Sequence, residues 1–192
     1  MGLLLDCNFS QISAQTIFTK FNCGNHDLNE FLQNDALPFL EARLGNTYIF
    51  TLNERPDSIV CFFTISNDAM KLSRDDNKAK RKVNKKIPHT KQMLSYPSVK
   101  IGRLGVNQLF RGAGLGTELM DFIKAWFYKD NKAACRFLLV DAYNEEEVLK
   151  YYLKNDFDYL LTEETESKKD KDGNPIPLKT RLMFYDLMQL RE

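Results

Sequence analysis

The spacing of apolar residues along the chain alternates between helical and strand periodicity. Apolar side chains recur at intervals of three and four residues in three segments, which predicts helices at about 27–43, 114–129 and 144–154. We expect the first helix to kink or break near Pro38 and to stop at Gly45. Proline lacks the amide proton that a helix interior needs, and glycine favours helix ends.

Short runs rich in β-branched and aromatic residues predict strands between these helices. The run 136–143 is almost continuously apolar, which is typical of a strand buried on both faces. The expected strands are a short one within 3–20, a hairpin of 47–52 and 58–66, and four more at 98–106, 136–143, 157–161 and 178–190, the last of which pairs with 157–161. This order of elements predicts an α/β (α+β) fold.

Length and composition describe an ordinary globular protein. With 192 residues, 43% of them hydrophobic and 28% charged, the chain can bury a core without disulfides or metal ions. We interpret residues 1–192 as a single domain. No apolar run is long enough to span a bilayer, and the first residues lack the basic segment of a signal peptide, so we expect a cytoplasmic protein.

Histidine and cysteine are too sparse for the common metal sites. The chain has two histidines, which excludes a three-histidine site. The four cysteines are far apart in the sequence and form no metal-binding or redox pair: Cys7, Cys23, Cys61 and Cys135. We therefore expect reduced thiols and no bound metal.

The charges are distributed unevenly, although the chain as a whole carries +1. The segment 71–91 has nine basic and two acidic residues, a local charge of +7, so the rest of the chain carries −6. We interpret 71–91 as a basic insertion and 162–177 as a polar loop. The basic insertion is either a solvated loop between strands or a contact for the phosphate backbone of RNA.

Five of the nine glycines fall between Gly102 and Gly116, where a predicted strand leads into a predicted helix. At such a place glycines let the backbone approach a ligand, and the helix N-terminus attracts an anion. Arg111 adds a charge that can pair with phosphate. The segment lacks the Gly-Lys-Ser/Thr of a Walker A loop, and Thr117 stands where a dinucleotide fingerprint needs its third glycine. The pattern therefore predicts a diphosphate site of another kind.

The spacing Arg-x-x-Gly-x-Gly, formed by Arg111, Gly114 and Gly116, resembles the pyrophosphate loop of the GNAT N-acetyltransferases. The resemblance implies a single GNAT-like domain with a mixed, mostly antiparallel sheet flanked by helices and a splayed central strand pair. It also implies acetyl-CoA as the co-substrate, with no metal. Its pyrophosphate is expected to lie on the segment made of Arg111, Gly112, Ala113, Gly114, Leu115, Gly116 and Thr117.

The resemblance continues in the segment VDAYNEEEVLKYYLKNDF. Family members carry an asparagine and a tyrosine ahead of a phenylalanine here, which correspond to Asn144, Tyr152 and Phe157. Tyr152 takes the place of the tyrosine in the family pattern FYxKxGF, with Tyr151 as the alternative, and Asp156 stands where the family often has glycine. The resemblance implies that Tyr152 protonates the leaving thiolate. Asn144 either binds the pantetheine arm or caps its helix.

The implied reaction is the attack of a primary amine on the thioester of acetyl-CoA. Backbone amides near Leu104 and Val106 are expected to polarise the carbonyl. A tyrosine, with a pKa of about 10, suits a donor to a thiolate whose thiol has a pKa of about 8.5. Glu118 and Asp141 lie near these motifs in the sequence, but we interpret both as structural or solvated rather than as a general base.

A narrower resemblance covers FNCGNHDLNEFLQNDA, TYIF and IGRLGV, which are similar to segments of acetyltransferase toxins from bacterial toxin–antitoxin modules. It implies the α-amine of aminoacyl-tRNA as the acceptor and a ribbon–helix–helix antitoxin as a partner. Small-molecule or protein amines stay open as acceptors, and a homodimer stays open as the assembly. A non-catalytic acetyl-CoA-binding module and a nucleotide-binding protein of another kind are the alternatives to the enzyme.

Overall fold

The computed structural model describes residues 2–18, 20–85, 87–112, 114–130 and 134–191. Its chain divides into two compact units. The first unit comprises Met1–Asn67 and Ile101–Trp126, and the second comprises Asp68–Lys100 and Phe127–Glu192.

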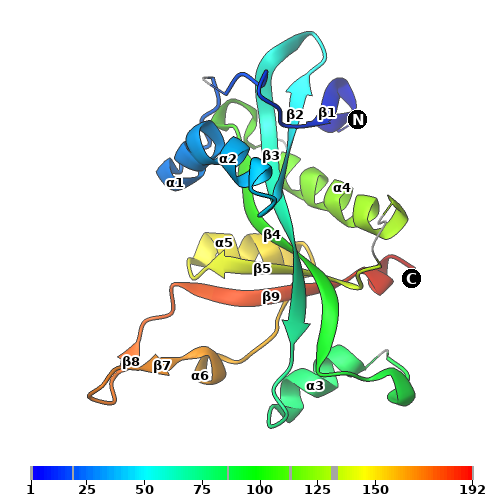
Figure 1. Ribbon diagram of the computed structural model, residues 1–192, viewed down its shortest axis with the longest axis vertical. Helices are drawn as coiled ribbons and strands as arrows, with labels where there is room; N and C mark the ends of the chain where they lie inside the picture. Colours follow the sequence, from blue (N-terminus) through cyan, green and yellow to red (C-terminus); the bar gives the residue numbers. More distant parts are fainter. Residues whose placement is uncertain (1, 19, 86, 113, 131–133, 192) are drawn as a thin grey trace. The chain divides into compact units, whose positions relative to one another are not determined.

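The first unit is built on strands in the order β1-β2-β3-β4 (Figure 1). The pairs β1–β2 and β2–β3 are antiparallel, and β2 and β3 form the predicted hairpin. The elements of this unit are a 3₁₀ turn at Leu3–Asp6, β1 (Cys7–Gln11), α1 (His26–Glu30), a π-helical turn at Phe31–Asp35, α2 (Ala36–Glu41), β2 (Asn46–Leu52), β3 (Arg55–Lys71), β4 (Ser95–Val106), a 3₁₀ turn at Gln108–Phe110 and α4 (Leu115–Asp130), where β3, β4 and α4 continue into the second unit.

Alternation along β2 and β3 gives this sheet two apolar faces. Ile49 and Phe62 are register partners, and they share a buried cluster with residues of the helical segment 26–41. Their neighbours Tyr48 and Phe63 are also register partners, and both rings lie within 6 Å of the Trp126 ring on α4, at centroid distances of 4.9 and 6.0 Å. The helical segment 26–41 therefore covers one face and α4 covers the other.

The first predicted helix is present, and its irregularity lies just before the predicted proline. α1 and α2 are joined by a π-helical turn at Phe31–Asp35, and Pro38 lies in the first turn of α2. A proline is tolerated there because the amide groups of a first turn have no partner inside their own helix.

The prediction that Gly45 stops this helix is wrong. The chain leaves the helix at Arg43, which has φ +57°. The amides of Arg43 and Leu44 donate to the carbonyls of Leu40 (2.9 Å) and Phe39 (3.0 Å), the two bonds of a Schellman motif. Gly45 serves packing instead, because a Cβ there would lie 2.6 Å from the Phe39 ring.

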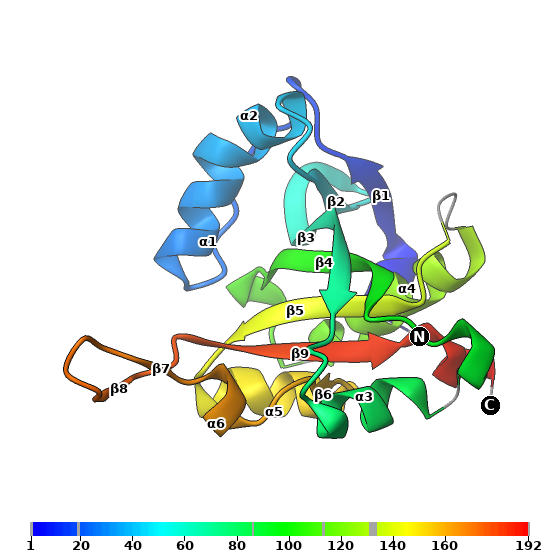
Figure 2. The ribbon, with the colours of Figure 1, turned by 60° about the horizontal axis from the view of Figure 1, so that its bottom comes forward.

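The second unit carries strands in the order β3-β4-β5-β9-β6, and Figure 2 shows β5 and β9 side by side. β4 and β5 are parallel, whereas β9 is antiparallel to both β5 and β6, so the sheet is mixed and mostly antiparallel, as predicted. The new elements are α3 (Asn77–Asn84), a 3₁₀ turn at His89–Lys91, β5 (Phe137–Tyr143), α5 (Glu146–Lys154), β6 (Asp158–Tyr159), α6 (Glu163–Glu166), β7 (Lys168–Lys169), β8 (Pro175–Ile176), β9 (Thr180–Asp186) and a 3₁₀ turn at Leu187–Arg191.

The pairing of β4 with β5 is short. Within the described residues, the register joins Ser98–Lys100 to Phe137–Leu139. β4 continues to Val106 and β5 continues to Tyr143, where β5 still pairs with β9. The hydrogen bonding between β4 and β5 thus ends part of the way along both strands, which agrees with the predicted splay of the central strand pair.

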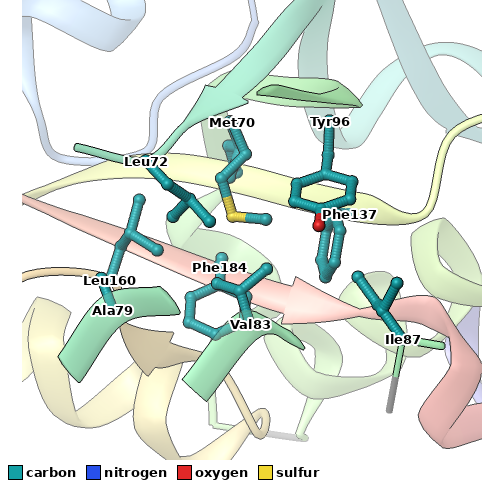
Figure 3. Packing of buried hydrophobic residues seen from close by; sticks show 10 residues of the cluster. Met70, Leu72, Ala79, Val83, Ile87, Tyr96, Phe137, Leu160 and Phe184 are labelled. Carbon is teal, nitrogen blue, oxygen red and sulfur yellow. The ribbon is translucent and has the colours of Figure 1, made fainter. Parts of the chain in front are cut away.

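The basic insertion is not a loop. Residues 77–84 form α3, which begins at Asp76, whose side chain accepts a hydrogen bond from the amide of Ala79 at 2.9 Å. Ala79, Val83 and Ile87 face the core of the second unit and pack against Met70, Leu72 and Phe184 (Figure 3). The high charge of 71–91 concealed Ala79 and Val83, which lie four residues apart and form the core-facing side of the amphipathic helix α3, with Ile87 buried beyond its end.

The polar loop at 162–177 is also ordered into elements. It contains α6 and a two-stranded sheet of β7 and β8. The Thr162 side chain caps α6 by accepting from the amide of Thr165. Two α6 glutamates pair with Arg181 of β9, so an ion cluster, which sequence periodicity does not reveal, holds α6 to β9.

Candidate functional site

The end of β4 carries Leu104 and Val106, and it is tightly held within the first unit. Asn107, which is 3% exposed, donates its backbone amide to the Val60 carbonyl at 2.9 Å and its side-chain amide to the Ile59 carbonyl at 3.0 Å. Gly105 is required by packing, because a Cβ there would lie 2.6 Å from the Phe62 ring. Since Gly105 packs inward on the core, the half-buried Leu104 and Val106 lie on the other face of the strand.

The glycine segment forms a turn that leads into α4. Gly112 and Gly114 have φ values of +91° and +75°, and a Cβ at either would have no neighbour within 4 Å. Both are therefore glycines because of backbone conformation and not because of packing. Ala113 lies outside the described residues.

The first turn of α4 follows directly. The amides of Thr117 and Glu118 donate to the Gly114 carbonyl at 3.0 and 3.1 Å. Leu115 is 2% exposed, so its side chain belongs to the core and it can offer a ligand only its backbone. The turn and the start of a 16-residue helix have the backbone form of an anion site.

Arg111 has a contact that sequence reasoning did not foresee. Its guanidinium donates to the carbonyl of Cys23, in the turn that precedes α1. The amide of Gln108 donates to the Asn22 carbonyl at 2.9 Å, and Gly24 has φ +74°, a backbone conformation that favours glycine. Residues 22–24 thus support the segment that leads into the glycine turn. The glycine in FNCGN is the feature of the sequence that could have indicated this turn.

Neither carboxylate considered as a base is free of structural contacts. Glu118 accepts a hydrogen bond from the amide of Leu4 at 3.0 Å. Asp141 forms an ion pair with Lys100. These contacts agree with the structural interpretation of both residues.

Tyr152 lies on α5 in the second unit and is buried, with 7% of its surface exposed. Its ring packs against those of Tyr151 and Phe157, at centroid distances of 5.1 and 5.4 Å. Burial raises the pKa of Tyr152 well above that of an ordinary tyrosine, because desolvation penalises the phenolate. Its hydroxyl is therefore protonated throughout the physiological range.

Asn144 neither starts nor caps α5. The N-cap position is Glu145, whose side chain makes no capping hydrogen bond. Asn144 instead donates its side-chain amide to the Leu178 carbonyl at 3.0 Å and its backbone amide to the Lys179 carbonyl at 2.9 Å. It therefore ties the end of β5 to the residues that precede β9. The side-chain oxygen of Asn144 is not used in either bond.

Asp156 explains the departure from the family pattern after Tyr152. The amides of Asp156 and Phe157 donate to the carbonyls of Leu153 and Tyr152, both at 3.0 Å, which closes α5 with a Schellman motif. Asp156 itself has φ +60°, the left-handed conformation for which glycine is preferred. The chain thus keeps the helix end that a glycine would give, with an aspartate in its place.

We expect the replacement Asp156→Val to lower the free energy of unfolding by about 1–2 kcal/mol, because a β-branched residue is strained in the left-handed region. Asp156→Gly is expected to leave stability unchanged or slightly higher. Urea unfolding measures both. Lys154→Val, an exposed position with ordinary helical geometry two residues earlier, is the control and should cost about 0.5 kcal/mol or less. Equal losses for the two valine variants would show that the backbone conformation of Asp156 is unimportant.

The structure was also searched for metal-binding groups and for membrane-spanning helices. Among the described residues, no group of three or more histidine, cysteine, aspartate or glutamate side chains could hold a metal ion. No helix in the described part of the chain is long and apolar enough to cross a membrane.

No protein-family model matches the sequence. Three solved structures resemble it in fold over nearly the whole length of both chains. A tyrosine-to-phenylalanine mutant of KacT has 20% sequence identity and a TM-score of 0.70, with 97% of this chain and 98% of that chain covered. AtaT complexed with acetyl-methionyl-tRNAfMet has 18% identity and a TM-score of 0.72, with 97% and 98% covered.

The third is a tyrosine-to-phenylalanine mutant of the AtaT toxin bound to the C-terminus of the antitoxin AtaR and to acetyl-CoA. It has 17% identity and a TM-score of 0.64, with 97% of this chain and 98% of that chain covered. The similarity confirms the predicted fold class. This chain therefore has the fold of KacT and of the toxin AtaT, with a mixed sheet flanked by helices.

Proposed function

We propose that this protein is a cytoplasmic N-acetyltransferase that transfers the acetyl group of acetyl-CoA to a primary amine. The observation that carries the proposal is the turn before α4, where Gly112 and Gly114 both adopt left-handed backbone conformations, in a chain with the fold of acetyl-CoA-binding toxins. A glycine turn at a helix N-terminus suits the pyrophosphate of acetyl-CoA, through the backbone of residues 111–117. Asn144 is proposed to contact the pantetheine arm through its side-chain oxygen.

The thioester carbonyl gains negative charge when the amine attacks. We assign its stabilisation to backbone amides at Leu104 and Val106, because the end of β4 is fixed by Asn107 and needs no rearrangement during the reaction. The tetrahedral intermediate then breaks its carbon–sulfur bond, and the electron pair leaves on sulfur as a thiolate. The amine loses one proton in the reaction, and the thiolate gains one.

Tyr152 is assigned to the leaving thiolate. Because burial raises its pKa, full transfer of the phenolic proton to a thiolate is uphill, whereas a hydrogen bond from the neutral hydroxyl to sulfur is available at every physiological pH. We infer that Tyr152 stabilises the developing thiolate through this hydrogen bond and relays a proton only as another reaches it. Two fold neighbours carry tyrosine-to-phenylalanine substitutions, which supports a tyrosine of special importance in such toxins.

The acceptor is proposed to be the α-amine of an aminoacyl-tRNA. Glu118 and Asp141 are both held in structural contacts, which favours a substrate that needs no general base. At pH 7 about 14% of an α-amine of pKa ~7.8 is neutral, against about 0.04% of a lysine amine of pKa ~10.4. The AtaT complex with acetyl-methionyl-tRNAfMet supports this choice. A ribbon–helix–helix antitoxin is the proposed protein partner, since AtaT binds the antitoxin AtaR.

The proposal is tested by acetyl transfer from radiolabelled acetyl-CoA to three acceptors: charged tRNA, lysine-containing peptides and polyamines. We expect label on charged tRNA and, after deacylation, on its amino acid. Label only on peptides or polyamines would refute the tRNA substrate and retain the acetyltransferase. Binding of acetyl-CoA without transfer to any acceptor would indicate a non-catalytic module.

A further inference from the structure

The helix α3 has a polar side as well defined as its buried one. Ala79 and Val83 point into the core of the second unit, as Figure 3 shows. Five polar residues lie at intervals of three and four along another side of the helix, and with Gln92 they line an open surface pocket: Asn77, Lys80, Arg81, Asn84 and Lys85. The residues that line the pocket include three cations and no carboxylate.

The cations of this pocket keep their charge unneutralised. Lys82, which is not among the lining residues, is the α3 lysine that pairs with an acid, Asp158, at 3.0 Å. Lys80 donates to a neutral group, the Arg74 carbonyl. Within the described residues, neither Arg81 nor Lys85 has an ion-pair partner. The pocket therefore concentrates positive charge, and the carboxylate of Asp158 is paired with Lys82 outside it.

Two of the three amide side chains that line the pocket, Asn84 and Gln92, are held by hydrogen bonds and still have hydrogen-bonding capacity. The Asn84 side-chain oxygen accepts from the Tyr96 hydroxyl at 2.7 Å, which directs its two N–H groups elsewhere. Gln92 donates to the Ile87 carbonyl at 3.1 Å, and its oxygen is not used in that bond. The pocket thus offers amide donors and an acceptor beside its three cations. Phosphate needs donors and cations, whereas a ribose 2′-hydroxyl both donates and accepts.

We propose that the α3 pocket binds the sugar–phosphate backbone of RNA, with Arg81 and Lys85 on phosphate oxygens and the amides positioned for a 2′-hydroxyl. The inference deepens the proposed function, on which it rests for the identity of the RNA as tRNA. It assigns to α3 a contact that holds the RNA by its backbone without reading its sequence.

Binding of deacylated tRNA to the full chain tests the pocket independently of acetyl transfer. Fluorescence anisotropy across a series of salt concentrations gives both the affinity and its salt dependence. The double variant Arg81→Gln/Lys85→Gln is expected to bind tRNA about tenfold more weakly and to reduce the salt slope by about two. The control Lys78→Gln/Lys82→Gln removes the same charge from the same helix outside the pocket, and should change affinity less than about twofold.

Three results would contradict RNA binding at the α3 pocket: equal losses of affinity for the two double variants, an unchanged salt slope, or a DNA hairpin of the same sequence that binds as tightly as the RNA. Transfer of acetyl to charged tRNA, measured in parallel, separates this inference from the proposed function. If the pocket variant keeps its tRNA affinity while the parent acetylates charged tRNA, RNA binding at the pocket is refuted and the proposed acetyltransferase function is supported. If the affinities behave as expected but no acetyl is transferred, the proposed function is refuted and RNA binding at the pocket is supported.

Discussion

Replacing Tyr152 with phenylalanine is expected to lower the rate of acetyl transfer by about 10²- to 10⁴-fold, the range typical of a lost proton donor. The substitution removes one oxygen and keeps the ring, which packs against Phe157 at 5.4 Å. The fold and the affinity for acetyl-CoA should therefore persist. The loss should fall on kcat, because the hydrogen bond to sulfur strengthens only as negative charge develops on the leaving group.

The raised pKa of Tyr152 also determines the expected pH profile. Because the pKa of Tyr152 is raised, its hydroxyl stays protonated well into the alkaline range. The rate of the parent enzyme should rise with pH as the α-amine loses its proton, near pH 7.8 for a typical α-amine, and reach a plateau without an alkaline decline near pH 10. The phenylalanine variant should keep the rising limb at a much lower rate.

Tyr151→Phe is the matched control, since Tyr151 is the adjacent tyrosine on α5 and its ring contacts that of Tyr152. It should keep at least about half of the parent rate if Tyr152 is the donor. Losses in Tyr151→Phe that exceed those in Tyr152→Phe would transfer the assignment to Tyr151. A Tyr152→Phe variant with the full parent rate would leave the tyrosine without a role in the reaction.

The sequence was informative where local backbone conformation or helical periodicity decides the residue type. Gly112 and Gly114 could be identified because positive φ favours glycine, and the apolar spacing along 114–129 predicted α4. Gly105 belongs to the same glycine cluster, but a glycine is needed there because the ring of Phe62, more than forty positions away in the sequence, leaves no space for a side chain. Sequence spacing cannot separate these two uses of glycine, because only the fold brings Phe62 to β4.

Polar residues were harder to interpret than apolar ones. Asn144 suited a helix cap in the sequence, but the strand pairing of β5 with β9 places the Leu178 carbonyl within its reach. Arg111 suited a phosphate contact, and in the fold its guanidinium donates to Cys23. In both cases a side chain with several donors found a nearby carbonyl, and tertiary structure decides which carbonyl that is.

Replacing Arg181 with methionine is expected to lower the free energy of unfolding by about 3 kcal/mol, the low end for a broken buried ion pair. Its side chain is 5% exposed, lies 4.5 Å from the Tyr159 ring centroid, and donates to Glu163 at 2.7 Å and to Glu166. Only 9% of the Glu166 side chain is exposed, and methionine at 181 would leave its carboxylate without this cation. Urea unfolding measures the loss.

The partner glutamates supply the comparison that isolates the buried charge. Glu163 has 73% of its side chain exposed, so Glu163→Gln should cost less than about 1 kcal/mol. Glu166 also accepts the Leu182 amide at 2.7 Å, a bond that the glutamine oxygen can keep, so Glu166→Gln should fall between the other two variants. A loss below about 1 kcal/mol for Arg181→Met would contradict the ion cluster as the link between α6 and β9. The order Arg181→Met, Glu166→Gln, Glu163→Gln follows from the groups that remain. Arg181→Met leaves the 9% exposed carboxylate of Glu166 without a cation, Glu166→Gln leaves Arg181 paired with Glu163, and Glu163→Gln changes an exposed side chain.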